Sequence, residues 1–342
     1  MRYSLIGCGR VSPEHIRAAK ANGLTIVGLC DVDPLALEEN LGFAMDFLGG
    51  VPFYTDYRDM LTEQNPQLVA IATPSGLHAW LARECMKYDA HVIIEKPIAM
   101  NLKDAQKITS DAEAYGLIAC CCFQNRFNPA VRALKSAVDA GRFGKIHSAS
   151  MQLRWHRGED YYRQAAWRGT REHDGGAMMN QGIHGIDLLN WMLGEPKKVT
   201  ALTARLAHDI EMEDVGMAAV QYENGALAQI QCETLRYPGA EEEVLELNGE
   251  HGAVRLGGIA GHLVETWRFD DAPPNEEAEM KQMYAKEPET VYGHGHTLLY
   301  QDALEAIAQG RPPLAGTTEG ARALRIILGA YESAATGKAV RL

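Results

Sequence analysis

The chain of 342 residues is long enough for two domains, and its composition, 46% hydrophobic and 23% charged, is that of a soluble globular protein. A formal net charge of −12 argues against a general nucleic-acid or anionic-membrane surface, although it permits a local basic patch for an anionic substrate. No apolar run reaches membrane-spanning length, and residues 2–6 already form a strand pattern, so we expect no signal peptide. The seven cysteines lack the spacing of a disulfide framework, which favours reduced thiols and a cytoplasmic location.

The first segments predict a strand, a glycine-rich turn, a helix and a second strand that ends in an acid. They span residues 2–6, 7–12, 13–21 and 24–31. Gly7 allows the tight turn, and Gly9 lets the backbone approach a pyrophosphate at the positive N-terminus of the helix. Asp31 is placed to accept hydrogen bonds from both ribose hydroxyls of an adenosine and repels a 2′-phosphate, which favours NAD over NADP. Ser12 replaces the usual third glycine and is small enough for close helix packing.

Strands and helices continue to alternate, and polar residues follow three of the predicted strands. The strands are 68–72, 91–94 and 117–123, and the polar segments after them are 73–78, 95–97 and 124–129. Ligands in open α/β sheets bind at these carboxyl ends. Lys96 is a candidate donor to a substrate hydroxyl or, once desolvated, a base; a surface lysine in a loop is the alternative. The three cysteines at 120–122 lie in an apolar run, which favours a buried strand over metal ligation.

Residues 175–191 predict a helix that begins with two glycines and carries a polar stripe. At about 100° per residue, Asn180, His184 and Asp187 lie within about 60° of one another. A polar stripe on an otherwise apolar helix implies a polar partner. We predict that the stripe faces a nicotinamide ring and a sugar hydroxyl; a helix with a hydrogen-bonded core histidine is the alternative.

The segment 154–173 is unusually basic for an acidic protein and is rich in aromatic residues. Arginines bind carboxylates and phosphates, and aromatic rings stack on a base or cover a sugar face, so the segment fits a nucleotide-sugar uronate. The alternative is a solvated loop with internal ion pairs, and a reach into a neighbouring subunit's site also stays open. The residues concerned are Arg154, Arg157, Arg163, Arg168, Arg171, Trp155, Tyr161, Tyr162 and Trp167.

The second half also predicts a strand meander, an acidic excursion and a last helix. The strands are 144–155, 198–207, 215–222, 226–235, 242–248, 253–256 and 263–269. They can form one large antiparallel sheet with one side free to pair with another subunit. Residues 270–289 predict an exposed excursion, and the helix 319–336 is expected to pack back on the first domain. No Cys or carboxylate set of metal-ligand spacing accompanies His294 and His296, so we predict no metal, with Tyr292 or His296 in a substrate pocket.

Five motifs together resemble the glucose–fructose oxidoreductase, inositol dehydrogenase and MocA family, in the family's order and through nearly the whole chain. They are residues 7–10, 73–78, 95–97, 126–129 and 175–187. The resemblance implies an α/β Rossmann N-terminal domain at 1–123 and an α+β domain with a large open, mostly antiparallel sheet at 124–342. It also implies NAD as cofactor, catalytic roles for Lys96 and His184, and a homodimer or homotetramer formed through the sheet.

One position departs from the common pattern of the family. Most members have an aspartate four residues before the histidine, where this chain has Asn180. The Asn-x-x-x-His version and residues 155–170 resemble the UDP-N-acetylglucosaminuronate 3-dehydrogenase branch, found in bacterial surface-polysaccharide pathways. That branch implies NAD-dependent oxidation of C3 of the nucleotide sugar and makes 2-oxoglutarate a plausible acceptor for the hydride of a retained NADH.

The hypothesis assigns four catalytic residues. His184 accepts the alcohol proton, Lys96 stabilises the developing alkoxide, Asn180 orients the substrate or the histidine, and Asp187 fixes the His184 tautomer or caps a structural network. The predicted cofactor contacts are Gly7, Cys8, Gly9, Arg10, Val11, Asp31, Thr73, Pro74, Ser75, His78, Glu95, Lys96, Gln124, Arg126, Trp167 and Arg168. The predicted substrate contacts are Lys96, Arg154, Arg157, Tyr162, Arg168, Asn180, His184, Tyr292 and His296. Two alternatives stay open: a dehydrogenase of a free sugar, an inositol, another polyol or a small dihydrodiol, and an inactive NAD(H)-binding regulator.

Overall fold

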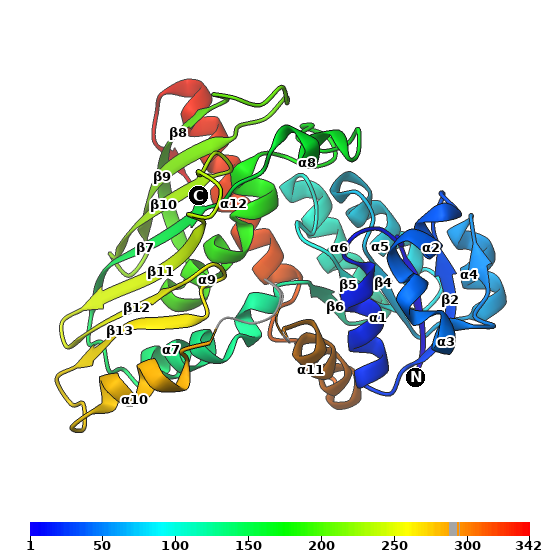
Figure 1. The fold of residues 1–342 in the computed structure, drawn as a ribbon, viewed down its shortest axis with the longest axis horizontal. Helices are drawn as coiled ribbons and strands as arrows, with labels where there is room; N and C mark the ends of the chain where they lie inside the picture. Colours follow the sequence, from blue (N-terminus) through cyan, green and yellow to red (C-terminus); the bar gives the residue numbers. More distant parts are fainter. Residues whose placement is uncertain (287–292, 294) are drawn as a thin grey trace. The chain divides into compact units, whose positions relative to one another are not determined.

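The computed structural model describes residues 1–286, 293 and 295–342, which divide into two compact units (Figure 1). Unit 1 consists of Met1–Gln124 and His294–Ala321, and unit 2 consists of Asn125–Gly293 and Arg322–Leu342. The sequence analysis assigned everything after residue 123 to the second domain, whereas the structure places the segment up to Ala321 that follows Gly293 in unit 1. Within the described residues, no helix combines the length and the apolar character that crossing a membrane requires.

Unit 1 contains a parallel sheet with the order β3-β2-β1-β4-β5-β6. Its strands are β1 (Arg2–Ile6), β2 (Thr25–Cys30), β3 (Phe53–Tyr54), β4 (Leu68–Ile71), β5 (His91–Ile94) and β6 (Ala119–Cys121). Side chains of β4 are buried along its whole length, which is the pattern of a parallel strand covered on both faces. The cysteines at 120–122 are buried as well, as predicted for a core strand.

The helices of unit 1 connect the strands. They are α1 (Ser12–Ala21), α2 (Leu35–Leu41), α3 (Met45–Leu48), α4 (Tyr57–Gln64), α5 (His78–Met86), α6 (Leu102–Tyr115) and α11 (Gly295–Gln309), with short 3₁₀ turns η1 (Gly42–Ala44) and η2 (Ser75–Leu77). In this unit α11 packs beside α1, and α5 packs beside α6 (Figure 1). Asn101 caps α6, and its side chain accepts a hydrogen bond from the backbone of Asp104.

Unit 2 contains a mixed, mostly antiparallel sheet with the order β13-β12-β11-β7-β10-β9-β8-β14. Its strands are β7 (Ile146–Arg154), β8 (Pro196–Ala204), β9 (Val215–Tyr222), β10 (Leu227–Glu233), β11 (Glu242–Gly249), β12 (Gly252–Gly257), β13 (Leu263–Phe269) and β14 (Val340–Arg341). β7 and β10 run parallel, and the other described pairs are antiparallel. The predicted fold class, a Rossmann domain followed by a domain with a large, mostly antiparallel sheet, is confirmed.

The helices of unit 2 include the predicted glycine-opened helix. They are α7 (Pro129–Asp139), α8 (Glu159–Arg163), α9 (Ile183–Leu193), α10 (Glu276–Met283) and α12 (Thr317–Thr336), with the 3₁₀ turn η3 (Gln124–Phe127) at the boundary of the two units. α10 lies in the predicted acidic excursion and buries none of its residues. The first residues of α12, up to Ala321, belong to unit 1, and its remainder belongs to unit 2, where Ser333 bonds to the backbone of Ala201 in β8.

The helix predicted over 175–191 is not continuous. Residues Ala177–Gln181 form the π-helical turn η4, closed by the backbone N–H of Gly182 on the carbonyl of Ala177 at 2.8 Å, and α9 begins at Ile183. A Cβ on Gly182 would lie 2.2 Å from Sγ of Cys232, so a larger residue here would require the buried Cys232 to move. The wider turn means that Asn180 does not keep the regular 100° spacing to His184 that the prediction assumed.

Candidate active site

The turn after β1 has the backbone that a bound pyrophosphate requires. Gly7 has a φ of +98°, and a Cβ there would lie 2.5 Å from the backbone of Ala72. A Cβ on Gly9 would meet nothing within 4 Å, so there is open space beside this part of the backbone. α1 begins at Ser12 without a capping hydrogen bond from a side chain, which leaves its positive end to a ligand. The residues present therefore fit a dinucleotide.

Asp31 stabilises this turn from the end of β2. Its Oδ2 accepts the backbone N–H of Cys8 at 2.7 Å, and its Oδ1 accepts that of Asp33 at 3.0 Å. Each carboxylate oxygen has two lone pairs, so both keep acceptor capacity for a ribose hydroxyl. Burial raises the pKa of the Cys8 thiol to about 12, so this neighbour is uncharged. Of the other predicted turn contacts, Arg10 is exposed and Val11 is half-buried.

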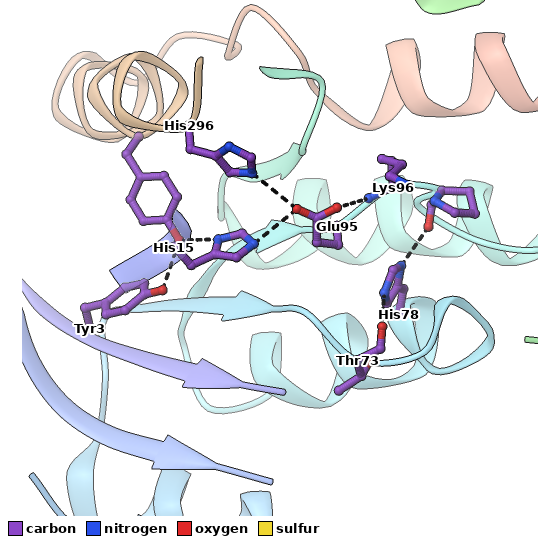
Figure 2. A network of polar contacts seen from close by, with 9 residues as sticks. Tyr3, His15, Thr73, His78, Glu95, Lys96 and His296 are labelled. Atoms are coloured by element: carbon purple, nitrogen blue, oxygen red, sulfur yellow. Dashed lines mark hydrogen bonds and ion pairs between the residues drawn. The ribbon is translucent and has the colours of Figure 1, made fainter. Parts of the chain in front are cut away.

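A second part of unit 1 joins the segments after β4 and β5. His78 is buried, its Nδ1 lies 2.8 Å from the carbonyl oxygen of Pro97, and its Nε2 lies 2.8 Å from that of Thr73. Both ring nitrogens thus face the protein, and His78 links the Thr73 loop to the Lys96–Pro97 loop (Figure 2). Pro74 is half-buried and Ser75 is buried in the same loop.

Glu95 and Lys96 follow β5, and their side chains have different environments. Glu95 is buried, and its Oε1 lies 3.1 Å from Nε2 of His15 and 3.5 Å from Nε2 of His296, while its Oε2 accepts the backbone N–H of Lys96 at 3.1 Å (Figure 2). Lys96 is half-buried. His296, predicted in a substrate pocket, is 3% exposed and directed at Glu95 from α11. Gln124, the first residue of η3, is also buried.

In unit 2, Asp187 on α9 pairs with Arg126. The guanidinium donates from Nε to Oδ2 and from Nη2 to Oδ1, both at 2.7 Å, and both residues are almost fully buried. The Trp191 ring lies 5.1 Å from the guanidinium carbon of Arg126. From the sequence, Arg126 is predicted as a cofactor contact, and Asp187 as a partner of His184 or part of a structural network. The structure shows the Arg126–Asp187 ion pair, and the roles of Arg126 toward the cofactor and of Asp187 toward His184 stay predictions.

Asn180 and its neighbour on η4 connect to the basic segment. The Asn180 amide donates to the carboxylate of Asp174, and its Oδ1 accepts from Nε2 of Gln181 at 2.7 Å. Gln181 also donates to the Tyr161 hydroxyl at 3.0 Å and accepts from Nη2 of Arg157 at 3.1 Å. One set of hydrogen bonds therefore joins the turn before His184 to the arginine-rich loop, and His184 itself is half-buried.

The arginines of that loop fall into two groups. Arg157 lies over the rings of Trp155 and Tyr161 at 4.7 and 5.1 Å, and Arg168 lies over those of Tyr161 and Trp167 at 4.2 and 5.0 Å. We call Trp155, Arg157, Tyr161, Trp167 and Arg168 the arginine–aromatic cluster. Two others pair with acids: Arg154 with Glu242 at 2.6 Å, and the exposed Arg163 with Glu159 at 3.6 Å. At Arg171 the backbone N–H donates to Glu211 at 2.8 Å. Tyr162 bonds instead to the hydroxyl of Thr234 at 3.1 Å.

The sequence analysis did not identify three residues that contact predicted site residues. Gln181 lies three residues before His184, and this helical spacing could have identified it as a residue on the same face of the predicted helix. Asp174 precedes the two glycines and also accepts the backbone N–H of Gly169 at 2.6 Å. His15 lies on α1 and reaches Glu95 across 80 positions, a pairing that no local pattern reveals. The predicted substrate contact Tyr292 lies outside the described residues.

Family comparisons cover most of the chain. Residues 1–122 match an oxidoreductase family with an NAD-binding Rossmann fold, named GFO_IDH_MocA, and residues 131–255 match the GFO/IDH/MocA C-terminal domain. Among curated proteins, the chain is 24% identical to D-apiose dehydrogenase of Paraburkholderia graminis over 99% of this chain and 89% of that protein. It is 24% identical to myo-inositol 2-dehydrogenase of Thermotoga maritima over 74% of each.

Two solved structures are more similar in sequence. The WlbA dehydrogenase from Bordetella pertussis, in complex with NADH and UDP-GlcNAcA, is 34% identical, with a TM-score of 0.89 over 100% of this chain and 98% of that one. The WlbA dehydrogenase from Chromobacterium violaceum, in complex with the same two molecules, is also 34% identical, with a TM-score of 0.90 over 100% and 96%.

Proposed function

Because this chain belongs to the Gfo/Idh/MocA family of oxidoreductases, we propose that it oxidises the C3 hydroxyl of a UDP-N-acetylglucosaminuronate-type nucleotide sugar. The coarser activity follows from the family: the chain is an NAD-dependent oxidoreductase that acts on the CH–OH group of a sugar or polyol. The proposal concerns the substrate and the residues that act on it.

The observation that carries the proposal is the bonding of the arginine–aromatic cluster to the turn before His184. Gln181 accepts from Arg157 and donates to Tyr161 and Asn180, so the cationic and aromatic side chains are positioned by the same turn that leads into the proposed base. Guanidinium groups bind phosphate and carboxylate in bidentate fashion, and flat rings stack on bases. A neutral polyol requires none of these groups, whereas a nucleotide-sugar uronate requires both.

The similarity to known proteins supports the same substrate class. The two WlbA structures, each with UDP-GlcNAcA, are 34% identical to this chain, and the D-apiose and myo-inositol dehydrogenases are 24% identical. The Asn-x-x-x-His pattern, Asn180 with His184, agrees with this reading. The free-sugar and inositol dehydrogenases are the basis for the second candidate, oxidation of a neutral sugar or polyol.

We assign the chemistry to residues in both units. NAD supplies the acceptor for the hydride from the alcohol carbon. His184, as a neutral imidazole, accepts the hydroxyl proton, because its ordinary pKa lies near the operating pH. Lys96 donates a hydrogen bond that stabilises developing negative charge on the alcohol oxygen. Asn180, held by Asp174 and Gln181, orients the substrate or the histidine without adding a charge.

Two further parts of the proposal concern partners. Sheet side chains at Leu202, Met217 and Leu227 are 77%, 47% and 58% exposed, and Leu202 pairs with Met217 across β8 and β9. These apolar residues fit a homodimer or homotetramer formed through the sheet.

We also propose 2-oxoglutarate as an acceptor that reoxidises NADH in place. Transfer of an isotope label from the substrate to 2-hydroxyglutarate tests the acceptor, and sedimentation of the purified protein tests the oligomer.

The deciding experiment is a product assay by mass spectrometry. Purified protein with NAD is offered UDP-N-acetylglucosaminuronate, UDP-N-acetylglucosamine, myo-inositol and glucose, each with and without 2-oxoglutarate. We expect loss of two hydrogens from the uronate alone, and a higher KM for it in Arg157→Met, with Arg163→Met, an exposed arginine of the same loop, as the control. Oxidation of only the neutral polyols contradicts the substrate assignment and makes the cluster structural or interfacial.

A further inference from the structure

A buried polar network in unit 1 surrounds the residue before Lys96. Its members come from five places in the unit, and Figure 2 shows His15 and His296 directed toward Glu95. They are Tyr3 on β1, His15 on α1, Glu95 after β5, Cys122 after β6, and His296 and Tyr300 on α11. Each is buried, and none of them has been given a role in the proposed reaction beyond the sequence-based expectations for Glu95 and His296.

The hydrogen bonds of this network can be assigned donor by donor. Burial lowers the pKa of His15, so its ring is neutral and has a single N–H. With that N–H on Nε2 it donates to Oε1 of Glu95 at 3.1 Å, and Nδ1 accepts from the Tyr300 hydroxyl at 2.7 Å. Tyr3 then donates to Tyr300 at 2.9 Å. Every rotatable group in this chain of bonds has one orientation, so it is a rigid support.

Glu95 is the charged member of the network. Burial by itself raises the pKa of Glu95, but the hydrogen bonds from His15 and His296 outweigh it and hold the pKa well below its usual range. Burial also raises the pKa of the Cys122 thiol, so that neighbour is neutral. The network therefore holds one carboxylate anion, whose second oxygen accepts the backbone N–H of Lys96 at 3.1 Å.

Lys96 is supported from its other side as well. Nδ1 of His78 lies 2.8 Å from the carbonyl oxygen of Pro97, the next residue, and Nε2 lies 2.8 Å from that of Thr73. Burial lowers the pKa of His78, so the neutral ring has one N–H and donates to one of these two carbonyls. Polar side chains thus lie against the backbone on both sides of Lys96, Glu95 before it and His78 after it (Figure 2). His15 lies on α1, the helix that follows the glycine-rich turn, so the bond from His15 to Glu95 connects the pyrophosphate-binding element to the segment that carries Lys96.

We propose that Glu95, with His15 and His296, forms a brace that positions Lys96 relative to the NAD-binding turn. The brace acts through the backbone N–H of Lys96, so these three are positioning residues rather than catalytic ones. The proposal rests on the assigned role of Lys96 in the proposed function. Stability alone is a weak reason for such a group, because buried charges in proteins are often replaced by apolar residues at no loss of stability.

The same side chains raise one other possibility. The ligand atoms of His15, Glu95, Cys122 and His296 all lie within 4.8 Å of one another, and nitrogen, oxygen and sulfur donors of this kind bind zinc. A metal ion held by these four residues would replace the hydrogen bonds that define the brace. The test therefore includes metal analysis of the purified protein.

The experiment compares Glu95→Ala and Glu95→Gln with His91→Ala. His91 lies at the other end of β5, where its Nδ1 accepts the backbone N–H of Ile118 at 2.9 Å, so its replacement removes a histidine hydrogen bond from the same strand. In Glu95→Ala we expect single-turnover formation of NADH to slow by about 10²-fold. If Glu95 acts only through Lys96, the NAD dissociation constant should stay within about threefold, whereas loss of the cofactor contact predicted for Glu95 would raise the constant further. The single-turnover rate of Glu95→Gln should lie between those of Glu95→Ala and wild type, and the rate of His91→Ala should equal that of wild type.

A second readout does not depend on the substrate. Reductive ¹³C-methylation labels Lys96, its NMR signal is assigned by its loss in Lys96→Arg, and its shift is recorded in the NAD complex. We expect a displaced signal in both Glu95 variants and an unchanged one in His91→Ala. If Glu95→Ala does not fold, Glu95→Gln and His15→Phe carry the same comparison.

Failure of the brace and failure of the proposed function give different results. Wild-type protein that oxidises another alcohol in the panel contradicts the uronate substrate, and the variants are then compared on that alcohol. Glu95 variants with wild-type rates or an unmoved Lys96 signal overturn the brace. So does a variant that loses stability only, with normal turnover per folded molecule. Stoichiometric metal that Glu95→Ala fails to retain overturns it too, in favour of a metal site.

Discussion

Lys96 in unit 1 and His184 in unit 2 each lie close in sequence to a buried carboxylate, and the two carboxylates are stabilised differently. Glu95, before Lys96, is held by imidazole and backbone donors. Asp187, one turn after His184, is held by the guanidinium of Arg126 with two bonds of 2.7 Å. The first arrangement is made of groups that titrate, and the second contains a cation that stays charged at every relevant pH.

The difference shows that burial does not by itself decide the charge of a carboxyl group. Glu95 keeps its pKa well below the usual range because donors surround it. Its contribution to stability is therefore present above the pKa of the unfolded chain and is lost as the pH falls through the folded value.

Replacing the two catalytic candidates tests whether each region contributes to the reaction. His184→Gln should lower turnover by about 10²- to 10⁴-fold, because a general base is lost. NAD affinity should not change, since the proposed cofactor-binding turn lies in unit 1. Lys96→Met should also lower turnover. Steady-state kinetics and NAD titration measure both quantities, and near-normal turnover in His184→Gln would remove it as the base.

Arg126→Met tests the ion pair of unit 2. The variant leaves Asp187 buried without its guanidinium, and we expect a loss of about 3–5 kcal/mol in the free energy of unfolding. Denaturant unfolding of the protein without NAD measures it. Lys281→Met is the control, since the exposed Lys281 pairs with Glu277 one turn away on α10, where such pairs contribute about 0.3–0.5 kcal/mol. Equal losses in the two variants would show that burial adds nothing to the Arg126 pair.

Glu213 in unit 2 extends the comparison to a carboxyl group with fewer donors. Its Oε1 accepts from the backbone of Met178 at 2.9 Å and from the Tyr331 hydroxyl at 3.0 Å. Its Oε2 has no hydrogen-bond partner in the part of the chain that the structure describes. Burial raises the pKa of Glu213 to about 7.

The raised pKa of Glu213 predicts a definite pH dependence. Because the folded pKa lies above the unfolded one, the stabilising contribution is full below the unfolded pKa and is lost as the pH rises through about 7. Glu213→Gln cannot ionise, so it should exceed wild type by up to about 3 kcal/mol at alkaline pH and match it in acid. Unfolding measured across the pH range checks this. Parallel curves for the two proteins would contradict the assignment.

The smallest effect is expected from replacing Asp31, a carboxylate that can still accept hydrogen bonds from a ligand. It is half-buried and accepts the backbone N–H of Cys8 at 2.7 Å. Asp31→Ala removes one charged acceptor for the ribose, so we expect the NAD dissociation constant to rise about tenfold. Isothermal titration measures it, with Asp33→Ala as the neighbouring control. An unchanged constant removes Asp31 from the ribose contact.

Much of the fold was predictable because it depends on residues close in sequence. Short-range geometry explains the alternation of apolar strands with helices in unit 1, the turn at Gly7 and Gly9, and the acid at Asp31. The predicted NAD cofactor agrees with the family match. The continuous helix over 175–191 was the local error. Regular periodicity does not show the contact between Gly182 and Cys232, which accompanies a π-helical turn.

The site was predictable only in part. The motifs identified Lys96, His184 and Asn180 as candidates, but not what holds them. The sequence analysis expected Glu95 and Arg126 to contact a cofactor, whereas in the structure each contacts a buried protein partner. Their roles toward cofactor remain predictions, as do those of the other residues. A single sequence shows which residues carry charge, but not which of them are buried against one another.

The sequence by itself determined the order of strands and helices, the glycine-rich turn and the chemical types of the candidate residues, because dihedral preferences and apolar periodicity act over a few residues. Only the tertiary structure decided that His15 meets Glu95 across 80 positions and that Arg126 meets Asp187 across 61. Burial deprives these side chains of water, so each must find a donor or acceptor wherever the packed chain offers one.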